Sequence, residues 1–212
     1  MQRKLKPEIK AIFFDVGGVI ISGICANTII QIKKEFGRWM TVPRLRVVRR
    51  HLRLATRGTC TVPKAVGNIS KALRLAPAGR RTLQCILSSK WYEQNSRINR
   101  NVLALARRLA RRYIVGIISD TIPSHTRINA RWGIYKHFSP VVLSHRTQAY
   151  KPEAKIFRYA LRKAGVLAPE VIFIDDRSDK LSGAVKLGMH GIIFKNATKL
   201  KHDLIKLGVL WK

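Results

Sequence analysis

The sequence predicts an α/β fold, in which a doubly wound parallel sheet carries an inserted helical cap. Short apolar runs at residues 11–14 and 171–174 are each followed directly by an aspartate. Predicted strands and helices alternate from residue 113 onward, which is typical of a parallel sheet covered by helices on both faces. Between these regions, apolar residues recur at helical spacing, which predicts a helical insertion.

The first predicted strand covers residues 11–14, between Lys10 and Asp15. Four consecutive apolar residues are typical of a strand that is buried on both faces. Asp15 would then emerge at the carboxyl edge of the sheet, where ligands of open α/β sheets bind. We therefore interpret Asp15 as a nucleophile rather than a surface charge.

The insertion follows this strand and is strongly basic. Between Gly37 and Arg112 the chain has nineteen lysines and arginines and a single acid, Glu93. Prolines and a glycine divide this stretch into several short helices. The predicted domains are therefore a core at residues 1–20 and 100–212 and a helical cap at residues 21–99.

The remaining elements follow in alternation. After a helix at 101–112, strands are predicted at 113–119, 141–144, 171–175 and 191–194, and helices at 123–132, 152–164, 181–187 and 199–207. Pro123 and Pro152 are expected in the first turns of their helices, and Gly165 and Gly188 where helices end.

Aspartates are scarce but cluster at predicted strand ends: four of the six in the chain are Asp15, Asp120, Asp175 and Asp176. Carboxylates gathered at one edge of a sheet repel one another, so a cation is expected among them. Mg²⁺ prefers such oxygen ligands, and Lys151 is a second candidate cation.

With these motifs, the chain resembles the haloacid dehalogenase superfamily of hydrolases, in particular members with a helical cap after the first motif. The matching segments are 15–18, 119–120, 150–157 and 173–177, in the family's order and spacing. The resemblance implies a Rossmann-like core. It also implies that Asp15 attacks phosphorus and that Lys151 holds nucleophile and phosphate together.

The resemblance further assigns phosphate binding and a metal site. Ser119 and the neighbouring Asp120 would bind the transferred phosphoryl group together with Lys151. The metal site would consist of Asp15, the carbonyl of Gly17, Asp175 and Asp176. Its cofactor would be Mg²⁺.

Gly17 departs from the family pattern. Most members have a second aspartate here, which protonates the leaving group and then activates water. Losing general acid–base help typically costs about 10²- to 10⁴-fold in rate, while positioning and electrostatic stabilisation remain.

Two further departures are Asp120, where an asparagine is usual, and Lys180, where another asparagine is common. The extra negative charge of Asp120 is unfavourable beside a phosphate unless it is paired, and Arg127 and Arg131 are candidate partners. Lys180 could neutralise either member of the acidic pair and compete with the metal.

The formal net charge of +31 is extreme, with 42 basic residues against 11 acids. It favours non-specific attraction to nucleic acid or to phosphoesters, unless it reflects a bias shared by every protein of the organism. No segment is apolar enough to predict a membrane span. Three cysteines at no metal-like spacing favour a reducing compartment, so we expect a cytoplasmic protein.

The sequence thus predicts a Mg²⁺-dependent phosphomonoester phosphatase that forms an aspartyl-phosphate and acts on a small phosphorylated substrate. The alternative is a catalytically weakened relative whose basic cap binds nucleic acid or an acidic partner. The sequence leaves the oligomeric state open.

Overall fold

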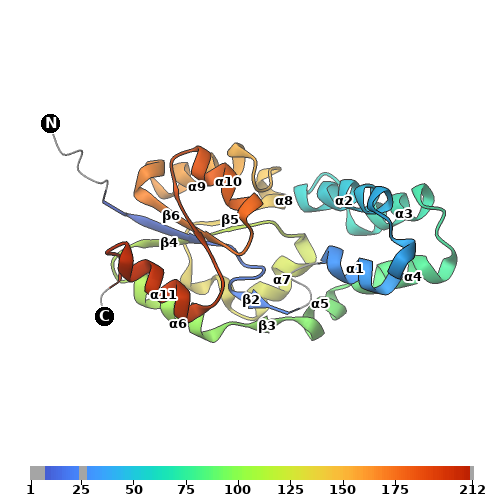
Figure 1. The fold of residues 1–212 in the computed structure, drawn as a ribbon, viewed down its shortest axis with the longest axis horizontal. Coiled ribbons are helices and arrows are strands. Elements are labelled where there is room, and N and C mark those ends of the chain that lie inside the picture. The colour runs from blue at the N-terminus through green and yellow to red at the C-terminus, as the bar shows by residue number, and fades with distance from the viewer. Residues whose placement is uncertain (1–7, 24–27, 211–212) are drawn as a thin grey trace.

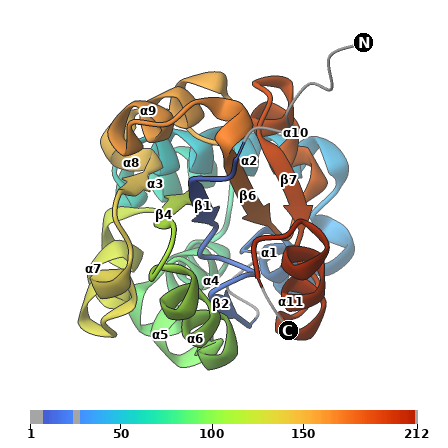
Figure 2. The same ribbon diagram turned by 90° about the vertical axis from the view of Figure 1, so that its left-hand side faces the viewer.

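A central sheet of five parallel strands organises the protein (Figures 1 and 2), in the order β5-β4-β1-β6-β7. The structure is a computed structural model and describes residues 8–23 and 28–210. The strands are β1 (Ala11–Phe14), β4 (Ile114–Ser119), β5 (Val141–Leu143), β6 (Val171–Asp175) and β7 (His190–Ile193). The chain builds outward from β1, first to β4 and β5 and then to β6 and β7, so β1 lies where the strand order reverses. The predicted fold class is confirmed.

Helices cover both faces of this sheet. Ile12 and Phe14 point into one hydrophobic core, whereas Ala11 and Phe13 point into the other. All four residues are fully buried, which explains why the strand is apolar throughout. The first core is closed by α6 (Arg100–Leu109), α7 (Pro123–Arg131) and α11 (Ala197–Lys206), and the second by α9 (Ala154–Ala164) and α10 (Ser178–Lys186).

Among the described residues, four of the helices between β1 and β4 form a group of their own beside the sheet (Figure 1). They have a separate hydrophobic core, which includes Ile32, Val48, Ile69 and Leu83. The helices are α1 (Thr28–Phe36), α2 (Val42–Arg57), α3 (Val62–Ala72) and α4 (Pro77–Ile86). The next helix, α5 (Ser89–Asn95), packs instead on the first core of the sheet through Tyr92. Within the part of the chain that the structure describes, no helix is long and apolar enough to cross a bilayer.

A two-stranded ribbon joins the two ends of the segment that contains α1 to α5. Strand β2 (Ile21–Ser22) pairs antiparallel with β3 (Arg97–Ile98), and the amide of Asn99 donates to the carbonyl of Ile20 at 2.8 Å. The sequence analysis missed this ribbon because two-residue strands leave no readable alternation of apolar and polar residues.

Some predicted boundaries are corrected. Pro123 is the first residue of α7, as expected, but α9 begins at Ala154 with Glu153 as its N-cap, so Pro152 lies outside the helix. The strand predicted at 141–144 ends at Leu143, because Ser144 begins the short helix α8 (Ser144–Thr147). In the part of the chain that the structure describes, there are also three 3₁₀ segments: Gly37–Trp39, Ile134–His137 and Ala168–Glu170.

Candidate active site

Asp15 and Asp175 lie side by side at the carboxyl edge of the sheet. Parallel pairing places Phe14 level with Ile174, and the amide of Asp15 donates to the carbonyl of Ile174 at 2.8 Å. Asp15 is therefore the first residue beyond β1, and Asp175 is the last residue of β6. This register brings two carboxylates together that are 160 residues apart in the chain.

Lys151 joins these two carboxylates. Its Nζ lies 2.8 Å from Oδ1 of Asp15 and 2.7 Å from Oδ2 of Asp175, and its side chain is only 1% exposed. The other oxygen of Asp175 accepts from the amide of Arg177 at 3.0 Å, and Oδ1 of Asp15 also accepts from the amide of Val16 at 2.7 Å. Both carboxylates are therefore held in fixed orientations.

The electrostatics of the cluster follow from this burial. Burial raises the pKa of Asp15 to about 7, although the ammonium of Lys151 acts in the opposite direction. For Lys151, burial alone would lower the pKa, but the carboxylates of Asp15, Asp175 and Asp120 hold it above its ordinary value. Lys151 is thus a charged ammonium at neutral pH.

A third carboxylate, that of Asp176, completes an acidic group. Oxygen atoms of Asp15, Asp175 and Asp176 lie within 4.8 Å of one another. Burial and the neighbouring Asp175 raise the pKa of Asp176, as expected where negative charges are crowded. Three carboxylates at this spacing suit a hard divalent cation, so the residues present fit Mg²⁺.

Gly18 makes room for this group. A Cβ atom at Gly18 would lie 2.2 Å from Oδ2 of Asp176, and the residue has a φ of +85°. Both features require glycine. Gly17 is different, because a Cβ there would meet no atom within 4 Å.

Asp120 and Lys180 hold the backbone of Lys151. The amide of Lys151 donates to Oδ1 of Asp120 at 2.9 Å, and Nζ of Lys180 donates to the carbonyl of Lys151 at 3.1 Å. Lys180 also forms an ion pair with Oδ2 of Asp120. Together, the two side chains contact both polar groups of the Lys151 main chain.

Comparison with known proteins identifies the family. The sequence family described as haloacid dehalogenase-like hydrolase matches residues 9–188, which include β1, β4, β6 and the whole acidic group. The chain belongs to the haloacid dehalogenase-like hydrolases.

Curated relatives match over shorter stretches. Glyceraldehyde 3-phosphate phosphatase of Methanocaldococcus jannaschii is 35% identical over 78 residues, which are 35% of this chain and 34% of that protein. Flavin mononucleotide hydrolase 1 of Arabidopsis thaliana is 37% identical over 59 residues, 28% of this chain and 24% of that protein. The matched stretches thus span about a third or less of these relatives' length.

Solved structures share the fold over almost the whole chain. A haloacid dehalogenase family enzyme from Bacteroides thetaiotaomicron superimposes with a TM-score of 0.71 at 20% identity and covers 93% of this chain and 98% of its own. A predicted hydrolase of the family from Porphyromonas gingivalis also has a TM-score of 0.71 at 20% identity. The match covers 96% of this chain and 99% of that protein's chain. At this identity the likeness concerns the fold.

Two expectations about charge pairing in this haloacid dehalogenase-like hydrolase are wrong. Asp120 pairs with Lys180 rather than with Arg127 or Arg131, and Arg131 contacts Glu93 at 2.9 Å instead. Lys180 therefore neutralises Asp120 and not the acidic pair. The sequence could not show this, because 60 residues separate the two partners.

The other predicted site residues lie at the same edge of the hydrolase core. Ser119 is the last residue of β4 and is only 2% exposed. Gly17 lies in the turn after β1 and bridges to Ile21, and this turn is closed by a hydrogen bond of 2.7 Å from the amide of Gly18 to the carbonyl of Ile21. The phosphate-binding role of Ser119 and the metal-binding role of the Gly17 carbonyl stay predictions.

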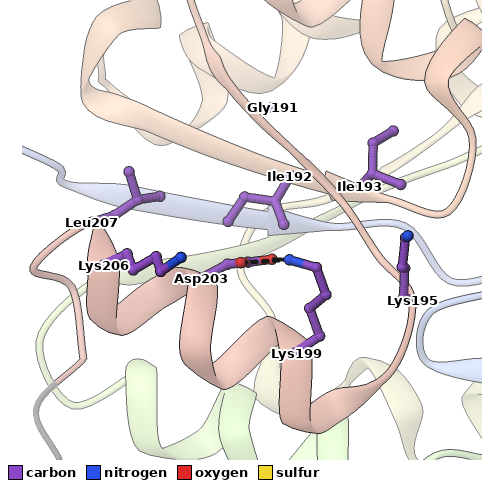
Figure 3. Close-up of a pocket in the computed structure, with 8 residues that line it drawn as sticks. All are labelled: Gly191, Ile192, Ile193, Lys195, Lys199, Asp203, Lys206 and Leu207. Atoms are coloured by element: carbon purple, nitrogen blue, oxygen red, sulfur yellow. Dashed lines mark hydrogen bonds and ion pairs between the residues drawn. The ribbon is translucent and has the colours of Figure 1, made fainter.

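A hollow of about 330 Å³ between β7 and α11 is separate from this edge (Figure 3). Lys195, Lys199 and Lys206 line it, and Lys199 donates to both oxygens of Asp203, at 2.7 and 2.8 Å. None of the predicted site residues lines it. Its main polar feature is an ion pair within one helix turn, so we place the candidate active site elsewhere.

Proposed function

We propose that this chain is a Mg²⁺-dependent phosphomonoester hydrolase with Asp15 as its nucleophile. The observation that carries the proposal is the buried ammonium of Lys151 between Asp15 and Asp175, with Asp176 beside them. This arrangement places a nucleophile beside a charged group that can bind a phosphate. It also supplies oxygen ligands for a cation at the same place.

In the proposed reaction, the carboxylate of Asp15 attacks the phosphorus atom of the substrate. A bond forms between Asp15 and phosphorus as the bond to the leaving oxygen breaks, which gives an aspartyl-phosphate. Water then attacks phosphorus, releases inorganic phosphate and restores the Asp15 carboxylate. Lys151 and Ser119 stabilise the negative charge on the phosphoryl oxygens.

The proposed cofactor is held by Asp15, Asp175 and Asp176, with the carbonyl of Gly17 as a further ligand. Mg²⁺ would neutralise charge on the phosphoryl oxygens and on the carboxylates around them. In support, a fold relative from Bacteroides thetaiotaomicron, at 21% identity, was crystallised with magnesium and inorganic phosphate.

The substrate is proposed to be a small phosphorylated molecule. The curated relatives named above, a glyceraldehyde 3-phosphate phosphatase and a flavin mononucleotide hydrolase, support this class. We propose that residues 21–99 act as a cap that selects the substrate, because helices α1 to α4 in this segment have a core of their own and the segment follows the turn after Asp15.

A catalytically weakened protein that binds an acidic partner is the second candidate. Gly17 favours it, because no carboxylic acid stands at this position to protonate a leaving group. The pairing of Asp120 with Lys180 works against it, since these two departures from the family pattern compensate each other's charge.

The decisive experiment is turnover of p-nitrophenyl phosphate by the wild type and by Asp15→Asn. This ester has a good leaving group, so it does not require a proton donor at position 17. We expect magnesium-dependent turnover that falls by about 10³-fold or more in the variant, since the nucleophile is lost. Wild-type turnover no faster than that of the variant would rule out the enzyme and leave the binding candidate.

Magnesium binding is tested separately by thermal unfolding. We expect Mg²⁺ to raise the melting temperature of the wild type, because a ligand that binds only the native state stabilises it by about 2.7 kcal/mol at 100 times its Kd. Asp176→Asn should reduce the shift, whereas Asp203→Asn on α11 is the matched control. Equal shifts in all three proteins would contradict the proposed metal site.

A further inference from the structure

A groove lined by arginines runs along α2, next to the loop that holds Lys151. We define the arginine groove by its lining residues, and its volume is about 500 Å³. This volume is within the range of small-molecule sites, roughly 300 to 1,000 Å³. The lining residues are Arg46, Arg49, Arg50, Arg53, Leu54, Arg57 and Tyr150.

The charge of the groove is of one sign. Its five arginines recur at helical spacing on one face of α2, and none of the described acidic residues lines the groove. Arg46, Arg49, Arg50 and Arg53 are exposed to solvent. With Arg57, the arginines span twelve residues of helix, and eleven steps of 1.5 Å give a length of about 16 Å. This length exceeds what one phosphate group needs.

Tyr150 orders the end of the groove nearest the candidate active site. The guanidinium groups of Arg53 and Arg57 lie 5.7 and 4.7 Å from the centre of its ring. Arg57 is further fixed by an ion pair with Glu153 and by a hydrogen bond of 3.4 Å to the carbonyl of Gln148. Arginines held in this way lose less conformational entropy when they bind a phosphate.

The same tyrosine links the groove to the catalytic loop. It directly precedes Lys151, and Nζ of Lys180 lies 6.0 Å from its ring centre on the way to Asp120 and the Lys151 carbonyl. A ligand whose reacting phosphate lies at Lys151 would thus have the groove beside it. Guanidinium groups recognise phosphate through paired charge-assisted hydrogen bonds.

We propose that the arginine groove binds a second phosphate group of the substrate, so that the enzyme prefers phosphate esters that carry at least two phosphates. This inference rests on the proposed phosphatase function. It adds the class of substrate and the residues that select it.

The test compares fructose 1,6-bisphosphate with fructose 6-phosphate, which differ by one phosphate. Binding is measured by calorimetry at constant ionic strength in the Asp15→Asn background, where turnover does not interfere. The groove variant is Arg50→Gln with Arg53→Gln. The control is Arg80→Gln with Arg81→Gln, which removes the same charge from exposed positions of α4 outside the groove.

We expect the background protein to bind the bisphosphate at least tenfold more tightly than the monophosphate. The groove variant should lose most of this preference, and the control should keep it. Equal binding of the two sugars, or an equal loss of preference in groove variant and control, would overturn the proposal. A groove variant that weakens binding of single-stranded DNA, while its preference for the bisphosphate is intact, would overturn it in favour of nucleic acid.

Failure of the proposed function has a different signature. In that case the wild type would not turn over p-nitrophenyl phosphate. This substrate is a monophosphate, so its turnover does not depend on the arginine groove. Selective binding of the bisphosphate would in that case still support the groove as a phosphate site. Turnover without selective binding would support the phosphatase and overturn the groove.

Discussion

Gly17 stands where the resemblance to the family implies a second aspartate, and it is also a position where the structure has space. A Cβ there meets no atom within 4 Å, whereas one at Gly18 would collide with Asp176. A single substitution can therefore introduce an acid here without a clash at its Cβ atom.

We predict that Gly17→Asp accelerates hydrolysis of an alkyl phosphate such as glycerol 2-phosphate. An acid at this position would protonate the poor leaving group, an effect typically worth about 10²- to 10⁴-fold. Gly17→Asn has the same shape but no transferable proton, so it should show no gain. The measurement is steady-state kinetics of both variants with glycerol 2-phosphate. Equal rates for Gly17→Asp and Gly17→Asn would mean that proton transfer does not limit the reaction.

Asp120 and Lys180 act as a pair at the residue scale. Their ion pair neutralises the carboxylate beside the candidate phosphate site, and both side chains contact the main chain of Lys151. Each single substitution leaves a charge without its partner. The double substitution to asparagine gives the uncharged pair expected from the family pattern.

We predict that Asp120→Asn and Lys180→Asn each lower kcat/KM for p-nitrophenyl phosphate about tenfold or more, and that the double variant recovers much of the loss. Contacting residues typically show coupling energies of about 0.5 to 3 kcal/mol in such cycles. Urea unfolding of all four proteins serves as the control for stability. Purely additive losses would mean that the two side chains act independently.

At the scale of elements, α5, the last helix before β3, packs on α7 of the core through stacked rings. The rings of Tyr92 and His125 are 3.8 Å apart at an angle of 12°, and Tyr92 donates to Asn129 at 3.0 Å. Within the described residues, Nε2 of His125 is buried and has no hydrogen-bond partner. Burial lowers the pKa of His125 to about 4.

This stack predicts how stability depends on pH. The unfolded chain binds a proton at His125 near pH 6.5, but the folded protein does so only near pH 4, so stability falls as the pH drops through this window. Between pH 7 and 5 the loss from His125 alone is about 2 kcal/mol. In urea unfolding, the free energy of unfolding of His125→Gln should fall between pH 7 and 5 by about 2 kcal/mol less than that of the wild type. The exposed His202→Gln is the control, and an unchanged slope in His125→Gln would contradict the assignment.

At the scale of the whole molecule, positive charge is spread over both the core and the helical group, while the acidic group is local. The 42 basic residues face only 11 acids, and several of those acids are used at the candidate active site. Such an excess destabilises the compact state through self-repulsion, which salt screens.

We therefore predict that sodium chloride stabilises the protein. Raising its concentration from about 20 to 300 mM shortens the Debye length from roughly 20 Å to below 8 Å. A gain of 1 kcal/mol corresponds to a rise in melting temperature of about 2 to 4 °C for a chain of this size. A melting temperature that does not change with salt would show that the net charge carries no cost in stability.

The sequence by itself determined the sheet and the edge at which the chemistry is expected. Buried runs that end in Asp15 and Asp175 specify parallel strands, because strands buried on both faces are apolar throughout. The carboxyl ends of such strands share one edge, so strand ends could be read as a candidate site without any coordinates. The roles of the residues there remain predictions.

Only the tertiary structure decided which charges meet. The partners of Asp120 and Arg131, the β2–β3 ribbon and the contact of Tyr150 with α2 all join residues far apart in the chain. Periodicity reports which face of an element is buried, but not which exposed side chain of another element it meets. That choice depends on how the elements pack against one another, which is fixed over the whole molecule.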